Sequence, residues 1–352
     1  MSPCSHKTNS FKVIIPALVK NIVDDQDLPV KAGHLNAISA TEIEVKLDTM
    51  LDTPLAVKID PIKLQLQIPK KDGDDDEDND AAFLELELPE TKVDGETEVK
   101  FPNQVVKVKD EKDLTAWFNA FFDNAQTDLR VTARDLTSHL GALKYVVDLD
   151  KNIQVNGLTY LEGFSAIDME FILPPDDKGD NIKGLLNIPN SGNLELGLQN
   201  PSFFMMAGDV KLGLVTLPDL VLKPGNNSAD FKGQFYFDAL VPNLPGILSS
   251  QGTGISEGVI NLNCTGNSTV DGNGDPIPYL EGVLNNKHIP LKIPITDLLS
   301  DLMSAFMDGG SLGDLDLGGG GNSTGGGLLD GLTNVFGNSS LFEGMLDRFE
   351  DS

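Results

Sequence analysis

The sequence predicts a mainly β protein, built as two tandem antiparallel β-sandwiches with a few short helices. Three observations support this fold class. Apolar and polar residues alternate with a period of two over most segments, which is typical of half-buried strands. Gly (35 residues) and Pro (20 residues) are plentiful, as many short turns require. Several segments of the first half also recur in the same order in the second half, and 352 residues suffice for two domains.

The clearest strands lie in the first half. Over residues 41–47, apolar side chains occupy every second position and Glu or Lys the positions between. Residues 63–68 and 83–88 follow the same pattern. Such alternation places all apolar side chains of a strand on one face of an antiparallel sheet.

Helical spacing is confined to three short segments. The first begins after Asp113, a good N-cap residue, and continues with an apolar stripe at helical spacing. Further short helices are predicted over 298–306 and 340–349. The aromatic part of the first stripe could bind an apolar ligand or pack the helix onto a sheet, and it comprises Trp117, Phe118, Phe121 and Phe122.

An internal duplication sets the expected domain organisation. Four segments of the first half resemble, in order, four of the second: 55–61 and 194–201, 129–133 and 259–263, 140–143 and 281–284, and 151–155 and 287–291. The repeat is too long for a solenoid and suits two copies of one domain. We therefore expect an N-terminal segment over 1–29, sandwiches over 30–160 and 161–300, and a Gly/Asp-rich tail with short helices over 301–352.

The charge balance excludes several partners. Lys and Arg number 26 against 54 Asp and Glu, giving a net charge of −28. Such an acidic chain disfavours nucleic acid and anionic lipid surfaces, both of which are held by clustered basic residues. The apolar stretch 13–19 is too short to span a bilayer, so membrane attachment is expected only through an anchor absent from this sequence. Cys4 and Cys264 allow at most one disulfide.

Five Asn-x-Ser/Thr triplets point to the secretory pathway. All five lie after residue 225 in segments predicted to be loops or turns, where a glycan can be accommodated. We expect a vacuolar-lumen or extracellular glycoprotein, with a cytoplasmic location as the alternative. The candidate acceptors are Asn226, Asn263, Asn267, Asn322 and Asn338.

No motif predicts catalysis, a cofactor or a metal site. Gly309–Gly313 matches the nucleophile-elbow pattern but lacks the strand before it and the helix after it. The acidic run 72–80 and the loop 271–275 begin like calcium loops, yet neither has Gly at the sixth position and Glu at the twelfth; weak calcium binding stays open for both. The four histidines form no zinc-binding pair. They are His6, His34, His139 and His288.

The segment 184–190, the strand 194–198 and the run 217–227 together carry a family resemblance. They resemble a fungal family of domains of unknown function, which is itself similar to late-embryogenesis-abundant, water-stress β-sandwiches. The resemblance is more specific over 161–300 than over 30–160. It implies tandem immunoglobulin-like sandwiches, often behind a membrane anchor with the repeats in the vacuolar or extracellular lumen. It implies no catalytic residues.

Within the resembling region, Lys223–Asn227 predicts a tight turn. Pro224 fixes φ at the first central position and Gly225 allows a positive φ at the next, as a type II turn requires. The expected structure is a hairpin connection.

Two function classes follow. The first is a non-catalytic lumenal or extracellular β-sandwich that acts as an interaction or structural protein, with a protein partner. The second is a lipid-binding module that uses an apolar groove of the same fold. An apolar cavity beneath the helix at 113–122 would favour the second class, and a core without voids would favour the first.

Overall fold

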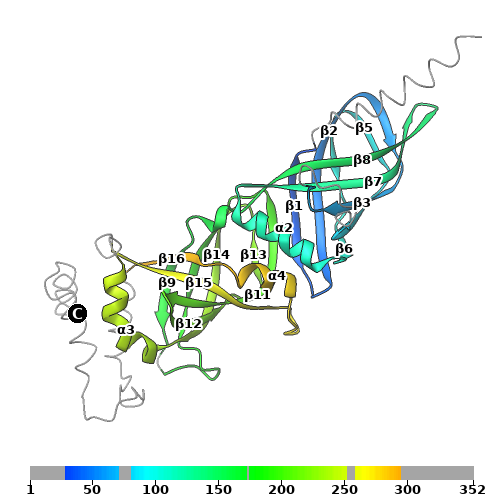
Figure 1. Cartoon of the computed structure of the whole chain (residues 1–352). Helices are drawn as coiled ribbons and strands as arrows, with labels where there is room; N and C mark the ends of the chain where they lie inside the picture. Colours follow the sequence, from blue (N-terminus) through cyan, green and yellow to red (C-terminus); the bar gives the residue numbers. More distant parts are fainter. Residues whose placement is uncertain (1–27, 71–80, 173, 252–257, 295–352) are drawn as a thin grey trace, which may run out of the picture.

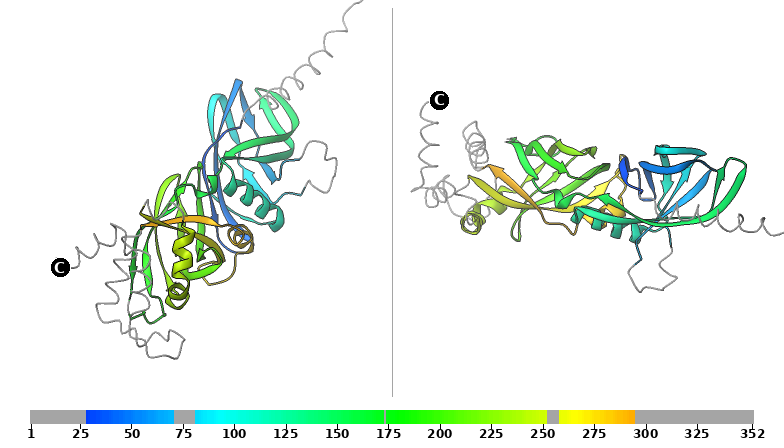
Figure 2. Two further views of the ribbon diagram at one scale, coloured as in Figure 1. Left: turned by 60° about the vertical axis from the view of Figure 1, so that its left-hand side comes forward. Right: turned by 90° about the horizontal axis from the view of Figure 1, so that it is seen from above.

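The structure is a computed structural model in which residues 28–70, 81–172, 174–251 and 258–294 are described. Within these ranges the protein is mainly β, with three α-helices. The molecule is elongated, and its two halves lie end to end (Figures 1 and 2). The strands of both halves join into one 16-stranded sheet. In the described ranges, no helix is both long and apolar enough to cross a membrane.

The first half is a strongly curved sheet that almost closes on itself. Strand β2 pairs with β1, β5, β6 and β7, and β7 in turn pairs with β3 and β8. At the open seam the backbone N–H of Lys109 donates to the carbonyl of Phe83 at 2.9 Å, bringing the end of β6 beside β4. The elements are β1 (Val30–Ala37), β2 (Glu42–Ile59), β3 (Ile62–Gln67), β4 (Leu84–Leu88), β5 (Thr91–Lys100), β6 (Gln104–Lys107), α2 (Glu111–Asp123), β7 (Gln126–Leu140) and β8 (Leu143–Asn156).

The second half is a closed, mixed barrel of seven strands. Following the pairings around the ring gives β11, β12, β14, β10, β9, β16 and β15, which returns to β11. All pairs are antiparallel except β16 with β9. The elements are η2 (Thr159–Leu161), β9 (Ser165–Phe171), β10 (Ile182–Asn190), β11 (Leu194–Ala207), β12 (Val210–Thr216), β13 (Leu220–Leu222), β14 (Gly225–Phe235), α3 (Phe237–Ser250), β15 (Val259–Val270), α4 (Pro278–Leu284) and β16 (Ile289–Pro294).

The expectation of a mainly β fold with few helices is confirmed. The expected pair of tandem immunoglobulin-like sandwiches is not what the structure shows. A sandwich has two separate sheets facing each other. Here the parallel pairing of β16 with β9 joins the two ends of the second half and turns its sheet into a barrel. Closure leaves that ring without the exposed edges that a sandwich would have.

Strand β1 joins the halves, because it pairs with β2 on one side and with β11 on the other. The Gln199 side chain reinforces this junction by donating to the Ala37 carbonyl at 2.6 Å. Helix α2 also packs against α4. Tyr279 of α4 also reaches the first half through its hydroxyl, which donates to the Glu42 carbonyl of β2 at 3.3 Å. The buried apolar residues accordingly form one continuous cluster that runs through both halves.

The predicted strands at 41–47, 63–68 and 83–88 are present as parts of β2, β3 and β4. The first predicted helix is α2, but it begins at Glu111. Its N-cap is Asp110 and not the expected Asp113. The Asp110 carboxylate accepts the backbone N–H of Asp113. The segments 298–306 and 340–349 lie outside the described residues.

The proposed duplication maps unevenly onto the elements. Segments 129–133 and 151–155 lie in the paired strands β7 and β8, and their counterparts lie at the paired strands β15 and β16. The segment 140–143 forms the tip between β7 and β8, whereas its counterpart is in helix α4. The expected boundary near residue 160 falls in η2. The division into 30–160 and 161–300 stays a prediction.

The turn at Lys223–Asn227 is present, but it does not connect a hairpin. Gly225 has φ of +100°, as the sequence requires. The Asn227 side chain holds the turn by accepting the N–H of Lys223 at 2.8 Å and donating to its carbonyl at 2.7 Å. However, β13 before the turn pairs with β11, whereas β14 after it pairs with β10 and β12. The turn therefore moves the chain between non-adjacent strands.

Candidate functional site

The predicted aromatic face lies in the core beneath α2. Trp117, Phe118, Phe121 and Phe122 are all buried. The Trp117 and Phe121 rings stack at 5.3 Å between centroids, and Phe118 stacks on Tyr279 of α4 at 6.3 Å. The Trp117 indole N–H donates to the Asp128 carbonyl at 3.1 Å, so its polar atom is also satisfied.

There is little room for a ligand beneath this helix. The cavity that Trp117 and Phe118 line has a volume of only about 10 Å³. That volume is at the lower limit for a single water molecule. The four aromatic side chains therefore form a packing face, which joins α2 to the sheet and to α4.

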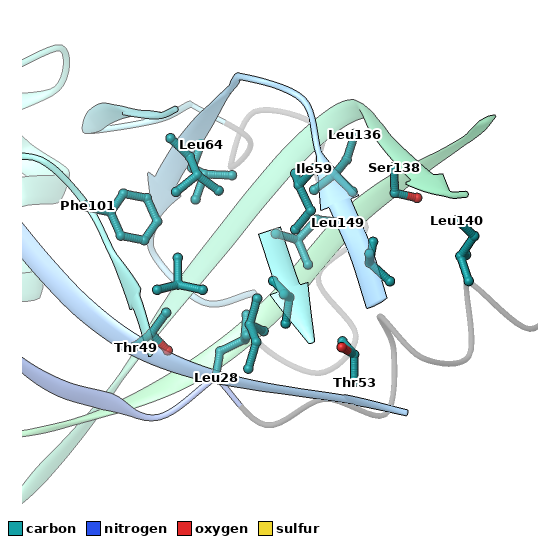
Figure 3. Close-up of a pocket in the computed structure, with 15 residues that line it drawn as sticks. Leu28, Thr49, Thr53, Ile59, Leu64, Phe101, Leu136, Ser138, Leu140 and Leu149 are labelled. Atoms are coloured by element: carbon teal, nitrogen blue, oxygen red, sulfur yellow. The ribbon is translucent and has the colours of Figure 1, made fainter. Parts of the chain in front are cut away.

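A larger apolar cavity lies elsewhere in the first half, and Figure 3 shows it in close-up. Its volume is about 120 Å³, and its lining comes from β2, β3, β4, β5, β7 and β8 together with Phe101 and Leu28. The side chains are aliphatic except for one phenyl ring and the hydroxyls of Thr49, Thr53 and Ser138. None of the described lining residues carries a charge.

The period of two explains why these side chains face inward. Thr49, Leu51 and Thr53 continue the apolar face of β2, and Leu136, Ser138 and Leu140 do the same on β7. The register of β2 against β5 shifts between Thr53 and Val57, and that of β7 against β8 shifts between Ala133 and Leu136. Such bulges bend strands and increase their twist, and here they occur in both long strands that border the cavity.

The three hydroxyls of the lining differ in their hydrogen bonding. The Thr49 hydroxyl donates to the Pro29 carbonyl at 3.0 Å. The hydroxyls of Thr53 and Ser138 are buried and have no hydrogen-bond partner in the described part of the protein. The cavity could not be predicted from the sequence, because small polar residues at inward-facing positions are its only signal there.

The described glycosylation candidates lie in strands and not in the predicted loops. Asn226 is exposed at the start of β14, directly after the turn. Asn263 and Asn267 are half-buried in β15, and the Asn267 amide donates to the Ser202 hydroxyl at 3.1 Å. Asn322 and Asn338 lie outside the described residues. Of the three placed acceptors, Asn226 is therefore the most accessible.

Of the two calcium-loop candidates and the elbow-like segment, the structure describes only the loop 271–275. Segments 72–80 and 309–313 fall in parts that the structure leaves undescribed. In the loop 271–275, the Asp271 carboxylate accepts the N–H groups of Asp275 and Asn273 at 3.0 and 2.8 Å, and these bonds hold the pKa of Asp271 below its usual range. Across the described ranges, no group of three His, Cys, Asp or Glu residues is placed to bind a metal ion.

The described histidines each have a local partner. His139 lies 2.9 Å from the Asp60 carboxylate, and His288 lies 3.0 Å from the Thr265 hydroxyl. His34 lies 3.0 Å from the Asn103 side-chain oxygen. His6 is outside the described residues. Cys264 is a buried free thiol, and burial raises its pKa to about 12, so it is a poor nucleophile near neutral pH.

Comparisons with known proteins give a family match for part of the chain. None of the curated proteins matches this chain. Among solved structures, a crystal structure of a protein from Archaeoglobus fulgidus matches with 12% identity over 37% of this chain and 97% of that one, with a TM-score of 0.22. That score is too low to support any structural argument.

A family model described as "Protein of unknown function (DUF3712)" matches residues 81–205. This range differs from the expected region of strongest resemblance, 161–300. It runs from just before β4 into β11, so it spans the expected boundary near residue 160 and includes α2, β7 and β8 of the first half. Residues 81–205 are therefore similar to a DUF3712 family domain, and this match covers about a third of the chain.

Proposed function

We propose that this protein is a non-catalytic binding module that takes a small apolar ligand, or the apolar part of a lipid, into the cavity of its first half. The observation that carries the proposal is the 120 Å³ apolar cavity bordered by β2 and β7. Ligand pockets are typically apolar with a few polar groups that orient the ligand, and this lining has that composition.

The size of the cavity limits what can enter it. An engineered cavity of about 150 Å³ lined by Leu, Ile and Phe side chains binds benzene. The present cavity therefore accommodates a compact group or a short piece of an alkyl chain. Leu28, Leu51 and Leu140 of the lining are partly exposed, so the rest of a longer ligand could extend past them.

Toluene provides a direct test, because a ligand that binds only the folded protein raises its melting temperature. We expect toluene to raise the melting temperature of the wild-type chain. Val99→Phe should remove that increase, because Val99 is buried in the lining and the larger side chain fills the cavity. The matched control is Val105→Phe on β6, whose side chain is 55% exposed.

Because Val99→Phe could overpack the core, Leu149→Ala serves as a second variant. It enlarges the same cavity and should preserve the toluene effect while lowering the basal melting temperature. No toluene effect in either wild type or Leu149→Ala would contradict the proposal.

An interaction or structural role with a protein partner is the second candidate function. The tight packing beneath α2 favours it, since the predicted groove is not hollow there. Leu143 and Val146 of β8 are also 51% and 53% exposed, and strand β8 pairs with β7 on one side. Exposed apolar side chains on an edge strand are compatible with a contact to another protein.

We also propose a vacuolar-lumen or extracellular location, supported by the exposed Asn226 acceptor. Protein secreted from a eukaryotic host should lose one glycan when Asn226 is replaced by Gln. Asn267→Gln is the matched control, because Asn267 is half-buried and its amide is already hydrogen-bonded. This variant should carry the same glycan mass as the wild-type protein. Intact mass before and after endoglycosidase treatment measures both. Wild-type protein without any glycan would remove the support for this location.

A further inference from the structure

We infer that two copies of this chain associate through strand β8, which pairs with β8 of the second copy in an antiparallel dimer centred on Val146. The inference does not involve the cavity ligand. It rests on the second candidate function, a contact to another protein, and names a second copy of this chain as the partner.

The first step is the free edge of β8. Within the described ranges, β8 pairs with β7 and with no other strand. Leu140 and Leu143 face each other across a two-residue turn, and such a closing pair exchanges both of its backbone hydrogen bonds. Alternation from this pair directs the backbone N–H and C=O groups of residues 144, 146 and 148 away from β7. Figure 1 shows the tip of this hairpin projecting from the end of the first half that lies away from the second half.

The second step is the exposure of the side chains along this edge. Leu143 and Val146 are 51% and 53% exposed, and Lys144 and Asp148 are exposed as well. A free strand edge that carries exposed apolar side chains can pair with another strand. Pairing would remove these apolar side chains from water and satisfy the outward backbone groups.

The third step is the order of the charges. In an antiparallel pair centred on Val146, Lys144 lies directly opposite the partner's Asp148, and Asp148 lies opposite the partner's Lys144. Opposite charges that face each other across two strands stabilise the pair. Residues 144, 146 and 148 are also the ones whose backbone groups point outward, so this register uses the available hydrogen bonds. The arrangement is self-complementary, as a two-fold symmetric interface requires.

The two charged side chains are available for this contact. Lys144 forms no salt bridge with any residue of the described ranges. One carboxylate oxygen of Asp148 accepts the N–H of Asp135 at 3.0 Å, opposite the bulge in β7. The second oxygen can therefore accept a hydrogen bond from the partner's ammonium group.

The apolar side chains match in the same register. Leu143 lies opposite the partner's Leu149, and Tyr145 lies opposite the partner's Val147. Tyr145 and Val147 are half-buried, and Leu149 is buried. An aromatic side chain opposite a β-branched one is a favourable cross-strand pair. The exposed Leu143 would thus be covered by the second copy.

Strand β5 shows the contrasting case of a protected edge. It pairs with β2 and with no other strand in the described part of the protein. Its exposed positions Asp94, Glu96 and Glu98 are all acidic. Two β5 strands paired around Glu96 would bring Asp94 against the partner's Glu98, and like charges directly opposite each other are destabilising. The charges of β5 therefore oppose self-pairing, whereas those of β8 favour it.

Sedimentation velocity of the full chain over a range of concentrations measures the association. The buffer contains about 0.15 M salt, which screens the mutual repulsion of two chains that each carry a net charge of −28. We expect a monomer–dimer equilibrium for the wild type. Lys144→Asp should weaken the dimer about tenfold or more, because both cross-strand charge pairs become repulsive. Asp148→Lys should have the same effect, with lysine facing lysine.

Lys92→Asp is the matched control, because it makes the same change of charge at an exposed position of β5. It should leave the dissociation constant of the dimer unchanged. Circular dichroism verifies that each variant is folded.

A rescue experiment separates pairing from damage to the hairpin. An equimolar mixture of the Lys144→Asp and Asp148→Lys proteins again places opposite charges across the interface. The double variant Lys144→Asp/Asp148→Lys does so within a single chain. Both should associate about as tightly as the wild type, although the hydrogen bond from Asp135 to Asp148 is lost wherever Asp148 is replaced.

The outcomes are distinct from those of the toluene test, so either proposal can fail alone. A wild type that stays monomeric at every concentration would overturn the inference and leave a different protein as the partner. Single variants that associate as the wild type does would place the dimer contact elsewhere and overturn it as well. Weakened single variants without rescue would show that the charges do not face each other, which also contradicts the inferred register.

Discussion

At the scale of single residues, two buried serines illustrate how the same side chain can have opposite effects on stability. Ser138 lines the cavity and its hydroxyl has no partner in the described protein. The Ser202 hydroxyl, by contrast, bonds to Ser268 and accepts from the Asn267 amide at 3.1 Å. The free energy of folding depends on whether such a group is satisfied and not on its burial alone.

We therefore predict that Ser138→Ala raises the free energy of unfolding of the ligand-free protein by about 1 kcal/mol, since it removes an unpaired buried hydroxyl. Ser202→Ala should lower it by a similar amount, because it deletes made hydrogen bonds. Urea unfolding followed by circular dichroism measures both. A loss of stability in both variants would show that the Ser138 hydroxyl is satisfied in solution.

Cys264 gives a prediction about alkaline pH. Its thiol pKa is raised by burial to about 12, whereas an unfolded chain has a thiol pKa of about 8.5. The unfolded state therefore ionises first as pH rises, and stability is lost between about pH 9 and pH 12. The thiol alone contributes about 1.4 kcal/mol per pH unit in that range.

The measurement is the free energy of unfolding from pH 8 to pH 11, for wild type and for Cys264→Ala. The variant starts from a lower stability, because it leaves a small cavity, but its curve should fall less steeply. Tyr279, whose pKa is also raised by burial, contributes to both curves equally. Parallel curves would contradict the buried state of the thiol.

At the scale of elements, α2 is fixed by its aromatic face. Phe121 is 1% exposed and stacks on Trp117. We predict that Phe121→Ala lowers the free energy of unfolding by about 3–5 kcal/mol, the usual range for a buried Phe. Lys112→Ala on the exposed side of the same helix should change it by less than about 0.5 kcal/mol. Chemical denaturation checks this, and a small effect of Phe121→Ala would mean that the helix is only loosely packed.

The elements with strong periodicity could be predicted from the sequence, and those with conflicting local signals could not. Strands β2, β3 and β4 follow from their alternation and α2 from its stripe. Helix α3 contains Pro242, Pro245 and Gly246, which normally end helices, so its formation depends on tertiary contacts. Helix α4 had one usable signal, Pro278 at its first position.

At the scale of the whole molecule, the closure of the second half into a barrel could not be predicted from local sequence patterns. Its deciding contact pairs Lys292 of β16 with Ser165 of β9, residues far apart in the chain. Alternation indicates which side chains share a face, but it does not indicate which strands become neighbours. The cavity was missed for a related reason. Inward-facing positions on β2 and β7 could be read from the sequence, but the empty space between them depends on how the bulged strands curve.

The continuous core leads to the last prediction, that both halves unfold in one transition. β1 is hydrogen-bonded to β2 and to β11, and the Lys287 ammonium of the second half lies 2.6 Å from the Asp123 carboxylate at the end of α2. Separating the halves would expose the edges of these strands and part of the shared apolar cluster. The free energy of each half therefore depends on the other being folded.

Leu262→Ala tests this coupling, because Leu262 is buried in β15 of the second half, whereas the single tryptophan, Trp117, reports on the first. The variant should lose about 2–5 kcal/mol. In the coupled molecule its unfolding midpoint, measured by Trp117 fluorescence, must shift as far as the midpoint measured by far-ultraviolet circular dichroism. If the halves were independent, the fluorescence midpoint would stay at its wild-type value while the dichroism curve split in two. Coincident shifts would mean that a ligand bound in the first-half cavity also stabilises the second-half barrel, because stabilisation by binding acts on the whole cooperative unit.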